Sequence, residues 1–528
     1  MAAGNYQVDL TDINLAETNT GWVDLNAAGG GGANSAEVDL AIQGSLAIHR
    51  SVSNTLRGVL YNNGSPITFG VNDHFFVWTV CATPGLADIK SAGGIRVVLG
   101  DGTGDYRDWY VNGSDTLPEG GMKNYAIHTS SAASRTVGTP GANPQFFGSQ
   151  ISTNGTARGD NFACDAIRYG TGYYIFDGDV TTPITFASAS QDNDLNANRF
   201  GVFTAVPGGF SLKGRFVIGQ TTASVATQAY FEDSNTAVAF ADTEYSLSDF
   251  TQINFDHAST VANLTNISFT AVGTNNPGQL NVLNASTTAS FNSLVFNSTG
   301  QTKLNANTRV TGSTWNTCGI IYQSGSSITT STFNDTSAAE SILISNDPSL
   351  ISNSDFVGDG TKFGIAVDTA GEYNFRGNTF TGFVSGSDPG AELLFDPTTG
   401  TGNLIINVLG GGSNLEYINR STGTVTINNN IAVTLTGMKD FSEVRVFDAT
   451  ALEANGAQVE LAGIENVVSA SVGANDNDFQ FSLAAGTLVD IAVHSLQYEY
   501  VRINDFTVPT ADTEVPIQQR FDRTFSNP

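Results

Sequence analysis

Short apolar runs, each closed by Gly, Asn, Asp or Pro, recur along the whole chain. In many of them apolar and polar positions alternate, which is the period of a half-buried β-strand, whereas helical periodicity is almost absent. We therefore expect an all-β protein. Changes in strand texture predict four segments: a jelly-roll-like sandwich at 1–225, a right-handed parallel β-helix at 226–430, an immunoglobulin-like sandwich at 431–508 and an extended tail at 509–528.

The N-terminal segment has the longest and most aromatic strand candidates. They lie at 74–80, 94–99, 108–111 and 124–127. Alternating strands of this length, joined by Gly-rich turns, are typical of a two-sheet antiparallel sandwich.

The middle segment repeats a six-residue pattern that reads apolar, any, small or polar, any, any, aromatic. Its six instances are 264–269, 291–296, 310–315, 328–333, 351–356 and 375–380, and their aromatic ends are separated by 27, 19, 18, 23 and 24 residues. A coil of three short strands uses a repeat of about this length and advances one strand spacing, ~4.8 Å. Stacked coils would align the aromatic residues in an internal ladder, although an irregular sandwich with chance Phe spacing is the alternative.

The third residue of each instance is expected at a tight turn, where small or polar residues tolerate unusual φ values. These residues are Asn266, Ser293, Gly312, Thr330, Asn353 and Gly377.

The C-terminal segment alternates clearly again, at 443–447, 458–461, 489–493 and 497–503. Strands of this number and length predict a small sandwich of immunoglobulin-like size. The polar stretch from Pro509 carries Arg520 and Arg523, flanked by Phe521 and Phe525, and suggests a tail that needs a partner surface.

Composition narrows the function classes. Charged residues make up 14% of the 528 residues, and 50 acidic against 22 basic residues give a net charge of −28. Bases this sparse argue against binding nucleic acid, whose phosphates attract clustered Lys and Arg. No segment approaches the ~18 apolar residues of a membrane helix, so we expect no membrane insertion. Because no basic and then apolar stretch follows Met1, we expect no signal peptide and synthesis in a cytoplasm.

Cysteine and histidine give little chemistry. Cys81, Cys164 and Cys318 lie far apart without zinc-ligand spacing, and we expect three buried thiols. The five histidines are scattered, and His74, which precedes an apolar strand, is expected to be structural. The sequence has no nucleophile elbow and no phosphate loop, so an enzyme would depend on carboxylates alone.

One acidic group lies in the repeat segment: Asp355, Asp359, Asp368 and Glu372. A glycoside hydrolase needs two carboxylates ~5–9.5 Å apart, and neighbouring coils could supply them. The ordinary alternative is that these residues are solvated turn caps.

Two further candidate sites lie in the first segment. A calcium site would use Asp101, Asp105, Asp108 and Asp115 with backbone carbonyls, although their spacing is not that of a defined calcium loop; no other cofactor is expected. A carbohydrate-stacking platform would use Trp78, Trp109, Tyr110 and Tyr125. Because alternation sends Trp109 and Tyr110 to opposite faces, one of the two is expected in the core.

The chain resembles structural proteins of tailed bacteriophages. The Gly/Asn/Ser/Thr-rich coils with aromatic ends at 264–380 look like the β-helical shafts of phage spikes. The segments 94–116 and 162–172 are similar to jelly-roll domains of marine phage virion proteins, and the last sandwich resembles their immunoglobulin-like modules. No catalytic residue is carried over, because the likeness is one of texture.

The resemblance implies a virion location, contacts with other virion proteins and a homotrimer. It favours a tail spike or fibre that binds a host-surface glycan. A capsid decoration or head-fibre protein is the alternative, and a polysaccharide depolymerase is a third.

Overall fold

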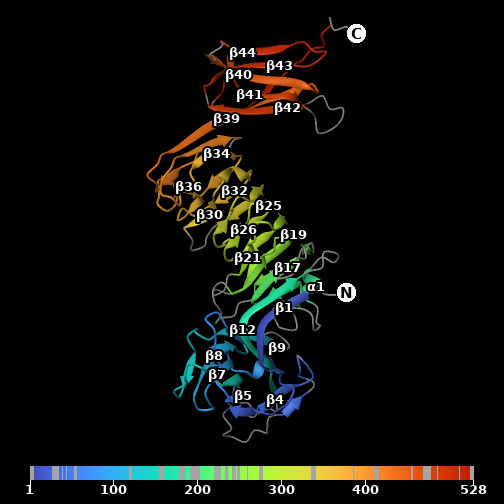
Figure 1. Ribbon diagram of the computed structural model, residues 1–528, viewed down its shortest axis with the longest axis vertical. Helices are drawn as coiled ribbons and strands as arrows, with labels where there is room; N and C mark the ends of the chain where they lie inside the picture. Colours follow the sequence, from blue (N-terminus) through green and yellow to red (C-terminus); the bar gives the residue numbers. More distant parts are fainter. Residues whose placement is uncertain are drawn as a thin grey trace. The chain divides into compact units, whose positions relative to one another are not determined.

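The computed structural model describes residues 5–523 apart from gaps at 26–34, 38–39, 43, 53–55, 118–121, 154–159, 178–184, 191–202, 219–227, 232–235, 241–244, 246–249, 259, 273–277, 335–339, 385, 410–414, 453–455, 468–476, 485 and 510–511 (Figure 1). Nearly all regular secondary structure of the described chain is β-strand, so the all-β prediction is confirmed. Its helices are single turns, namely α1 (Phe186–Ala189), η1 (Pro84–Leu86), η2 (Lys90–Ala92) and η3 (Pro348–Leu350). No helix in these ranges is long and apolar enough to cross a membrane.

The chain divides into two compact units. Unit 1 comprises Met1–Arg309 and Trp315–Ile321, and unit 2 comprises Val310–Thr314 and Tyr322–Pro528. Three short strands lie at this division: β25 (Thr308–Thr311), β26 (Thr314–Asn316) and β27 (Ile321–Tyr322).

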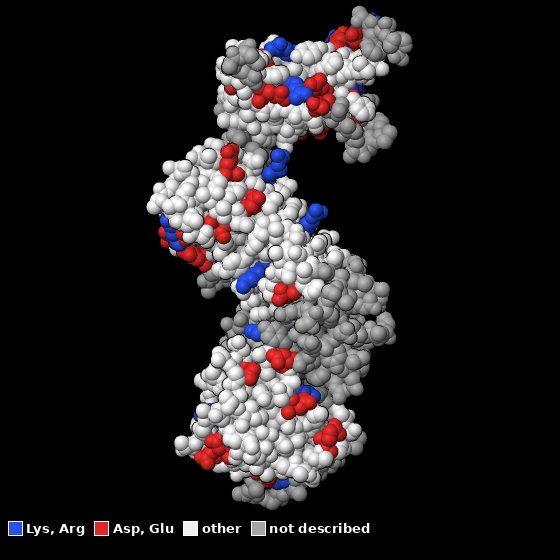
Figure 2. All heavy atoms as spheres, in the orientation of Figure 1, with Lys and Arg blue, Asp and Glu red and all other residues white. Residues whose placement is uncertain are grey.

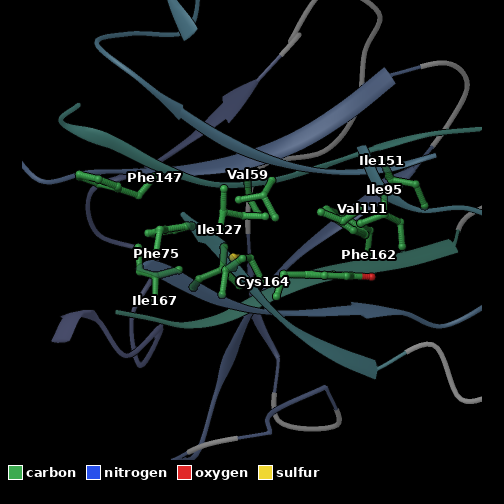
Figure 3. Close-up of a cluster of buried hydrophobic side chains, with 14 of the residues drawn as sticks. Val59, Phe75, Ile95, Val111, Ile127, Phe147, Ile151, Phe162, Cys164 and Ile167 are labelled. Carbon is green, nitrogen blue, oxygen red and sulfur yellow. The ribbon is translucent and has the colours of Figure 1, made fainter. Parts of the chain in front are cut away.

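Unit 1 begins with a two-sheet sandwich whose strands pair antiparallel. One sheet has the order β10 (Arg135–Val137), β8 (Tyr106–Asn112), β7 (Ile95–Gly100), β11 (Phe146–Ser152), β5 (Leu56–Asn62) and β2 (Trp22–Leu25). The facing sheet contains β3 (Ser35–Glu37), β4 (Ala47–Val52), β12 (Asp160–Asp177), β6 (His74–Cys81), β9 (Met122–His128) and β1 (Asn5–Asn14). The inward side chains of both sheets form one apolar core, which includes Phe75, Phe147 and Phe162 (Figure 3).

The long strand β12 connects this sandwich to the coils of unit 1. Its first half pairs with β4 and β6 of the sandwich, and its second half pairs with β1 and with the first coil strand, β15 (Figure 1). Phe250, just before β18, packs on Phe76 and Ala126 of the sandwich. The sandwich and the first coils therefore share an apolar contact.

The coils of unit 1 form three parallel sheets. The first holds β15 (Arg215–Ile218), β18 (Gln252–Phe255), β21 (Gln279–Val282) and β24 (Thr302–Lys303); the second holds β14 (Gly209–Leu212), β17 (Thr236–Phe240), β20 (Ile267–Ala271) and β23 (Val295–Asn297), with β13 (Phe203–Val206) antiparallel at its edge; the third holds β16 (Gln228–Phe231), β19 (Val261–Thr265) and β22 (Thr288–Asn292). One strand per sheet and coil, with parallel pairing between coils, is the arrangement of a parallel β-helix.

Unit 2 contains coils of the same kind. Its first sheet holds β30 (Ser341–Ser345), β33 (Phe363–Val367), β36 (Leu393–Phe395) and β38 (Tyr417–Asn419); the second holds β29 (Thr332–Asn334), β32 (Asp355–Val357) and β35 (Thr379–Thr381); the third holds β28 (Ser327–Thr329), β31 (Ile351–Ser352), β34 (Gly371–Arg376), β37 (Leu404–Leu409) and β39 (Val425–Met438).

The predicted aromatic ladder is present within each unit. In unit 1 the rings of Phe269, Phe296 and Trp315 stack at 5.3 and 4.9 Å, and Phe240 extends the stack at 5.9 Å. In unit 2 Phe333, Phe356 and Phe380 stack at 4.6 and 4.9 Å. All six third-position residues have positive φ, between 50° and 63°. The repeat pattern therefore predicted both the interior and the turns correctly.

The C-terminal sandwich of unit 2 has two small sheets. One has the order β41 (Gln458–Val467), β40 (Ser442–Leu452), β43 (Leu488–His494) and β44 (Val501–Thr507); in the other, β39 pairs with β42 (Asn477–Ala484) and with β45 (Thr513–Pro516). The strand β45 lies in the segment expected to be a tail. Residues 513–516 thus belong to the sandwich, because β39 offers an edge that they pair with in parallel.

All three cysteines are free and buried, as predicted. Burial raises the pKa of the Cys164 thiol to about 12, which keeps it protonated and unreactive at neutral pH.

Candidate functional site

The four aromatic residues of the expected stacking platform do not lie together. Trp109 and Tyr125, 1% and 4% exposed, belong to the core between the two sheets of the first sandwich. Burial raises the pKa of Tyr125. Trp78 is half-buried on the outer face of β6, and Tyr110 is half-buried on the outer face of β8 in the other sheet. Alternation correctly separates Trp109 from Tyr110, but no platform forms, because the two outward rings lie on opposite sides of the sandwich.

Tyr110 is also covered on one side. The guanidinium carbon of Arg96 lies 4.5 Å from the centre of the Tyr110 ring. The backbone N–H of Tyr110 donates to Ser134 Oγ at 3.0 Å, and Ser134 Oγ is 2.6 Å from the hydroxyl of Tyr245. This ring is therefore part of a packed polar contact and not a free stacking surface.

The four aspartates proposed for calcium are not gathered either. Asp101 accepts from the backbone N–H of Gly141, Asp105 from Thr139 at 2.8 Å and Asp115 from Lys90 at 2.9 Å. Asp101 and Asp105 thus both hold the loop between β10 and β11, whereas Asp115 holds the turn at Lys90. Within the described ranges, no group of three or more His, Cys, Asp or Glu side chains is placed to hold a metal ion.

The fourth aspartate, Asp108, lies in a buried ion network on the outer face of the six-stranded sheet. It is fully buried, and its Oδ2 accepts from Arg135 Nε at 3.0 Å and Nη2 at 2.5 Å, and from Arg96 Nη1 at 3.5 Å. Burial lowers the pKa of Arg135, but the hydrogen bonds and the charge of Asp108 outweigh it, so the net shift is upward. Arg135 also donates to the hydroxyl of Tyr106 at 3.1 Å. We interpret the network as a structural tie between β7, β8 and β10.

The carboxylates of the coils accept hydrogen bonds from neighbouring groups, within their own turn or from the next coil. Asp359 accepts from the backbone and the hydroxyl of Thr361, at 2.9 and 2.6 Å, and these bonds lower its pKa. Asp355 accepts from Thr379 Oγ1 at 2.5 Å, and Asp368 from Thr369 Oγ1 at 3.0 Å. Asp359 and Asp368 thus match the turn-cap alternative, whereas Asp355 links strand β32 to the next coil.

Glu372, the fourth acid of this group, accepts from Asn407 Nδ2 at 2.9 Å. It lies on β34 of the third sheet, whereas Asp355 lies on β32 of the second. The group is therefore spread over different faces of the coils.

Sequence reasoning missed an exposed apolar cluster at one end of the C-terminal sandwich. It contains the three most exposed aromatic side chains of the described chain and one leucine. We call it the apolar tip: Phe441 (65% exposed), Leu496 (71%), Tyr500 (57%) and Phe521 (55%). Of its four residues, the sequence analysis singled out Phe521 alone, as part of a polar stretch that needs a partner surface.

Three chain segments meet at the apolar tip. The β39–β40 turn contributes Phe441, the β43–β44 loop contributes Leu496 and Tyr500, and the C-terminal stretch contributes Phe521. Ser495 Oγ donates to the carbonyl of Asp440 at 3.4 Å, which joins the turn to the loop. A β-bridge between Tyr498 and Phe521 joins the loop to the C-terminal stretch. These links bring together residues up to 80 positions apart.

The tip lies at the end of the sandwich remote from the coils of unit 2. The strand β39 pairs with coil strand β37 up to Asn429 and with sandwich strand β42 from Asn430 onward. At ~3.3 Å per residue, its end at Met438 lies about 30 Å beyond the coil pairing.

Charge is balanced at the tip and sparse elsewhere. Residues 439–441, 494–500 and 519–523 contain three bases and three acids, namely Lys439, Arg520, Arg523, Asp440, Glu499 and Asp522. The face in Figure 2 is mostly uncharged, with acidic and basic side chains in a few small groups as well as singly.

No protein-family model and no curated protein matches this chain. Among solved structures, an exo-β-agarase is 12% identical with a TM-score of 0.23, and the match covers 31% of this chain and 24% of that one. The CBM22-1 xylan-binding domain of Paenibacillus barcinonensis Xyn10C is 15% identical with a TM-score of 0.20, covering 32% of this chain and 96% of the domain. The catalytic domain of Agl-KA is 11% identical with a TM-score of 0.21, covering 81% and 98%. Similarities this low carry no argument about function.

Proposed function

We propose that this chain is a structural protein of a tailed-bacteriophage virion, a homotrimeric spike or fibre that adheres to a glycan on the host surface. The observation that carries the proposal is the stacked aromatic interior of the coils in both units. Each coil packs on the coil before it and the coil after it through all three of its strands. A stack of coils is therefore a stiff support for a binding module.

The polar surface of the coils supports the same function. Outward residues of β22 and β25 are exposed Thr, Ser, Asn and Arg side chains, whereas their inward neighbours are buried. A net charge of −28 per chain keeps such an assembly soluble and discourages unspecific association. Weak sites on three chains would add up through multivalency.

The first experiment is quantitative mass spectrometry of purified particles that contain this protein. A handful of trimers per particle supports a tail spike or fibre. A ratio of dozens or more relative to the major shell protein would indicate the alternative, a capsid decoration or head-fibre protein. Absence from every particle would refute the virion proposal.

The assembly state needs a separate measurement. Sedimentation velocity of the full chain should give about 166 kDa for three chains of 55.4 kDa. A 55-kDa species at micromolar concentration would refute the homotrimer while leaving the virion proposal open to the mass spectrometry result.

A depolymerase is the third candidate. Release of new reducing ends from a bound polysaccharide would support it, and the carboxylate group of the coils is the first place to test. Replacing both Asp359 and Asp368 by Asn should abolish such cleavage without affecting adhesion. An unchanged cleavage rate would exclude this assignment of the site.

A further inference from the structure

We propose that the apolar tip is the surface that binds the glycan, and that its ligand is an uncharged oligosaccharide stretch of a host polysaccharide. The inference rests on the proposed function for the statement that a glycan is bound. It adds the site and the chemical class of the ligand.

Phe521 and Tyr500 have neighbouring rings, Tyr498 at 6.1 Å and His494 at 6.4 Å, yet all four side chains of the tip remain more than half exposed. Three aromatic rings and a leucine more than half exposed form an apolar surface on the order of 400 Å², since a buried aromatic side chain covers ~150–250 Å². A contiguous patch of this size on a monomer often marks a binding site. Aromatic rings are the side chains whose flat faces pack against the C–H faces of pyranose rings.

Backbone strain at the tip also indicates a binding site. Phe441 has a φ of 62°, which is unfavourable for a bulky residue, and its ring remains 65% exposed. Strain of this kind persists where the surroundings enforce it, and it is enriched at functional sites. Here the turn directs an aromatic ring to solvent without burying it.

The loops that carry the rings are held in place before any ligand binds. Lys439 N–H donates to Gln519 Oε1 at 2.8 Å and Ser442 Oγ donates to the same oxygen at 3.1 Å. The backbone N–H groups of Glu499 and Asp522 donate across to Arg520 and Gln497, at 2.8 and 2.9 Å. A surface fixed in this way loses little conformational entropy on binding.

Area and charge favour a saccharide over the other possible occupants. A stable protein interface, including one with a second copy, buries about 800 Å² per partner over roughly 20–30 residues, many more than the four apolar side chains of the tip. An anionic lipid surface attracts clustered bases, and the three bases of the tip are balanced by three acids. The balanced charges at the tip give no preference for an ionic ligand, while Gln497, Glu499 and the Tyr500 hydroxyl can exchange hydrogen bonds with sugar hydroxyls.

The test uses the full chain on an array of bacterial capsular and O-antigen polysaccharides that includes neutral and uronic-acid-containing members. Tyr500→Ala and Phe521→Ala are compared with Leu452→Ala. Leu452 is a matched control because it is 66% exposed and lies at the opposite end of β40. Thermal unfolding of each variant checks that it folds.

We expect wild type and Leu452→Ala to bind the same neutral polysaccharides, and each tip variant to bind them at least about tenfold more weakly, as for an interface anchor. Equal binding by folded tip variants would overturn this inference and leave the proposed glycan adhesion intact. Binding confined to uronic-acid polysaccharides would overturn the ligand class. No saccharide binding by wild type would refute the glycan part of the proposed function itself. Co-sedimentation with phosphatidylethanolamine–phosphatidylglycerol vesicles, lost in the tip variants, would replace the saccharide by a membrane.

Discussion

Acid should weaken unit 1 through one histidine at the contact between the sandwich and the first coils. The ring of His74 is fully buried and stacks on Phe250 with a centroid distance of 3.8 Å. Burial is the largest cause of its depressed pKa, and the nearby His128 ring, at 5.0 Å, adds to it, as do the charges of Arg215 and Lys213. Together they lower the pKa of His74 from 6.5 to about 3.

The sign and size of the effect follow from linkage. Between pH 6.5 and about 3 the unfolded chain binds a proton on His74 that the native chain does not, so stability falls as the pH falls through this window. Above pH 6.5 neither state binds the proton and the group has no effect. One pH unit inside the window costs ~1.4 kcal/mol, so lowering the pH from 7.5 to 5 removes about 2 kcal/mol of the free energy of unfolding.

The assay is equilibrium urea unfolding at both pH values, followed by tryptophan fluorescence, since Trp22, Trp78 and Trp109 all lie in this sandwich. His74→Phe keeps a ring against Phe250 and removes the titration. Its loss of stability between pH 7.5 and 5 should be smaller than that of wild type by about 2 kcal/mol. The control is His494→Gln, because His494 is exposed on the other sandwich and its replacement should leave the wild-type pH dependence unchanged.

An equal loss in His74→Phe and wild type would refute the reasoning, since the proton would then be taken up elsewhere. Carboxylates also titrate in this range, but they contribute equally to both proteins. The comparison between variants therefore isolates the histidine.

Three further predictions concern stability. Phe356→Ala should lower the free energy of unfolding of the unit 2 coils by about 3–5 kcal/mol, because the Phe356 ring stacks between two other rings. Val357 is its outward neighbour, and Val357→Ala should change this free energy by about 0.5 kcal/mol or less. Calorimetry of both variants tests the difference. Asp108→Asn should lower the free energy of unfolding by about 3–5 kcal/mol, because it leaves Arg135 and Arg96 without their buried counter-ion. Asp115 is exposed, and Asp115→Asn should lower it by about 1 kcal/mol or less, measured in the same urea titration. Phe441→Gly should raise the stability of the C-terminal sandwich by about 1 kcal/mol by relieving its positive φ, and a lower melting temperature would contradict the strain argument.

The coils could be predicted in detail because their signal is local and repeated. Each six-residue instance specifies an inward apolar residue, a turn with positive φ and an inward aromatic ring, so six instances reinforce one register. The ring of Phe240 was missed because the pattern does not extend to this coil, where the residue paired with Phe269 is Val238. Phe240 lies two residues further along β17 and is paired with Ala271, yet its ring stacks on that of Phe269 at 5.9 Å.

The functional surfaces could not be predicted in the same way. Alternation separates Trp109 from Tyr110, but it states neither which of the two points outward nor which sheet each strand joins. Trp78 and Tyr110 in fact lie in different sheets. The apolar tip is assembled from turns without any periodicity, and its members meet only because the β-bridge at Tyr498 and the bond from Ser495 close the loops. Exposure of an aromatic residue in a turn has no sequence signature of its own.

The coils and the tip also differ in how much hydrogen-bonding and apolar surface they leave for a ligand. On the coils, outward amides bond to the same residue one coil away, as in unit 2 where Asn428 donates to Asn407 at 2.9 Å and Asn407 to Asn374 at 3.2 Å. In unit 1 Asn316 likewise donates to Asn297 at 2.9 Å. Each coil thus satisfies the polar groups of the next, and a ligand would have to replace bonds already made. In the described chain the end loops of the C-terminal sandwich do not stack on a repeat. Exposed rings remain there, so recognition is expected at these loops and not along the stack.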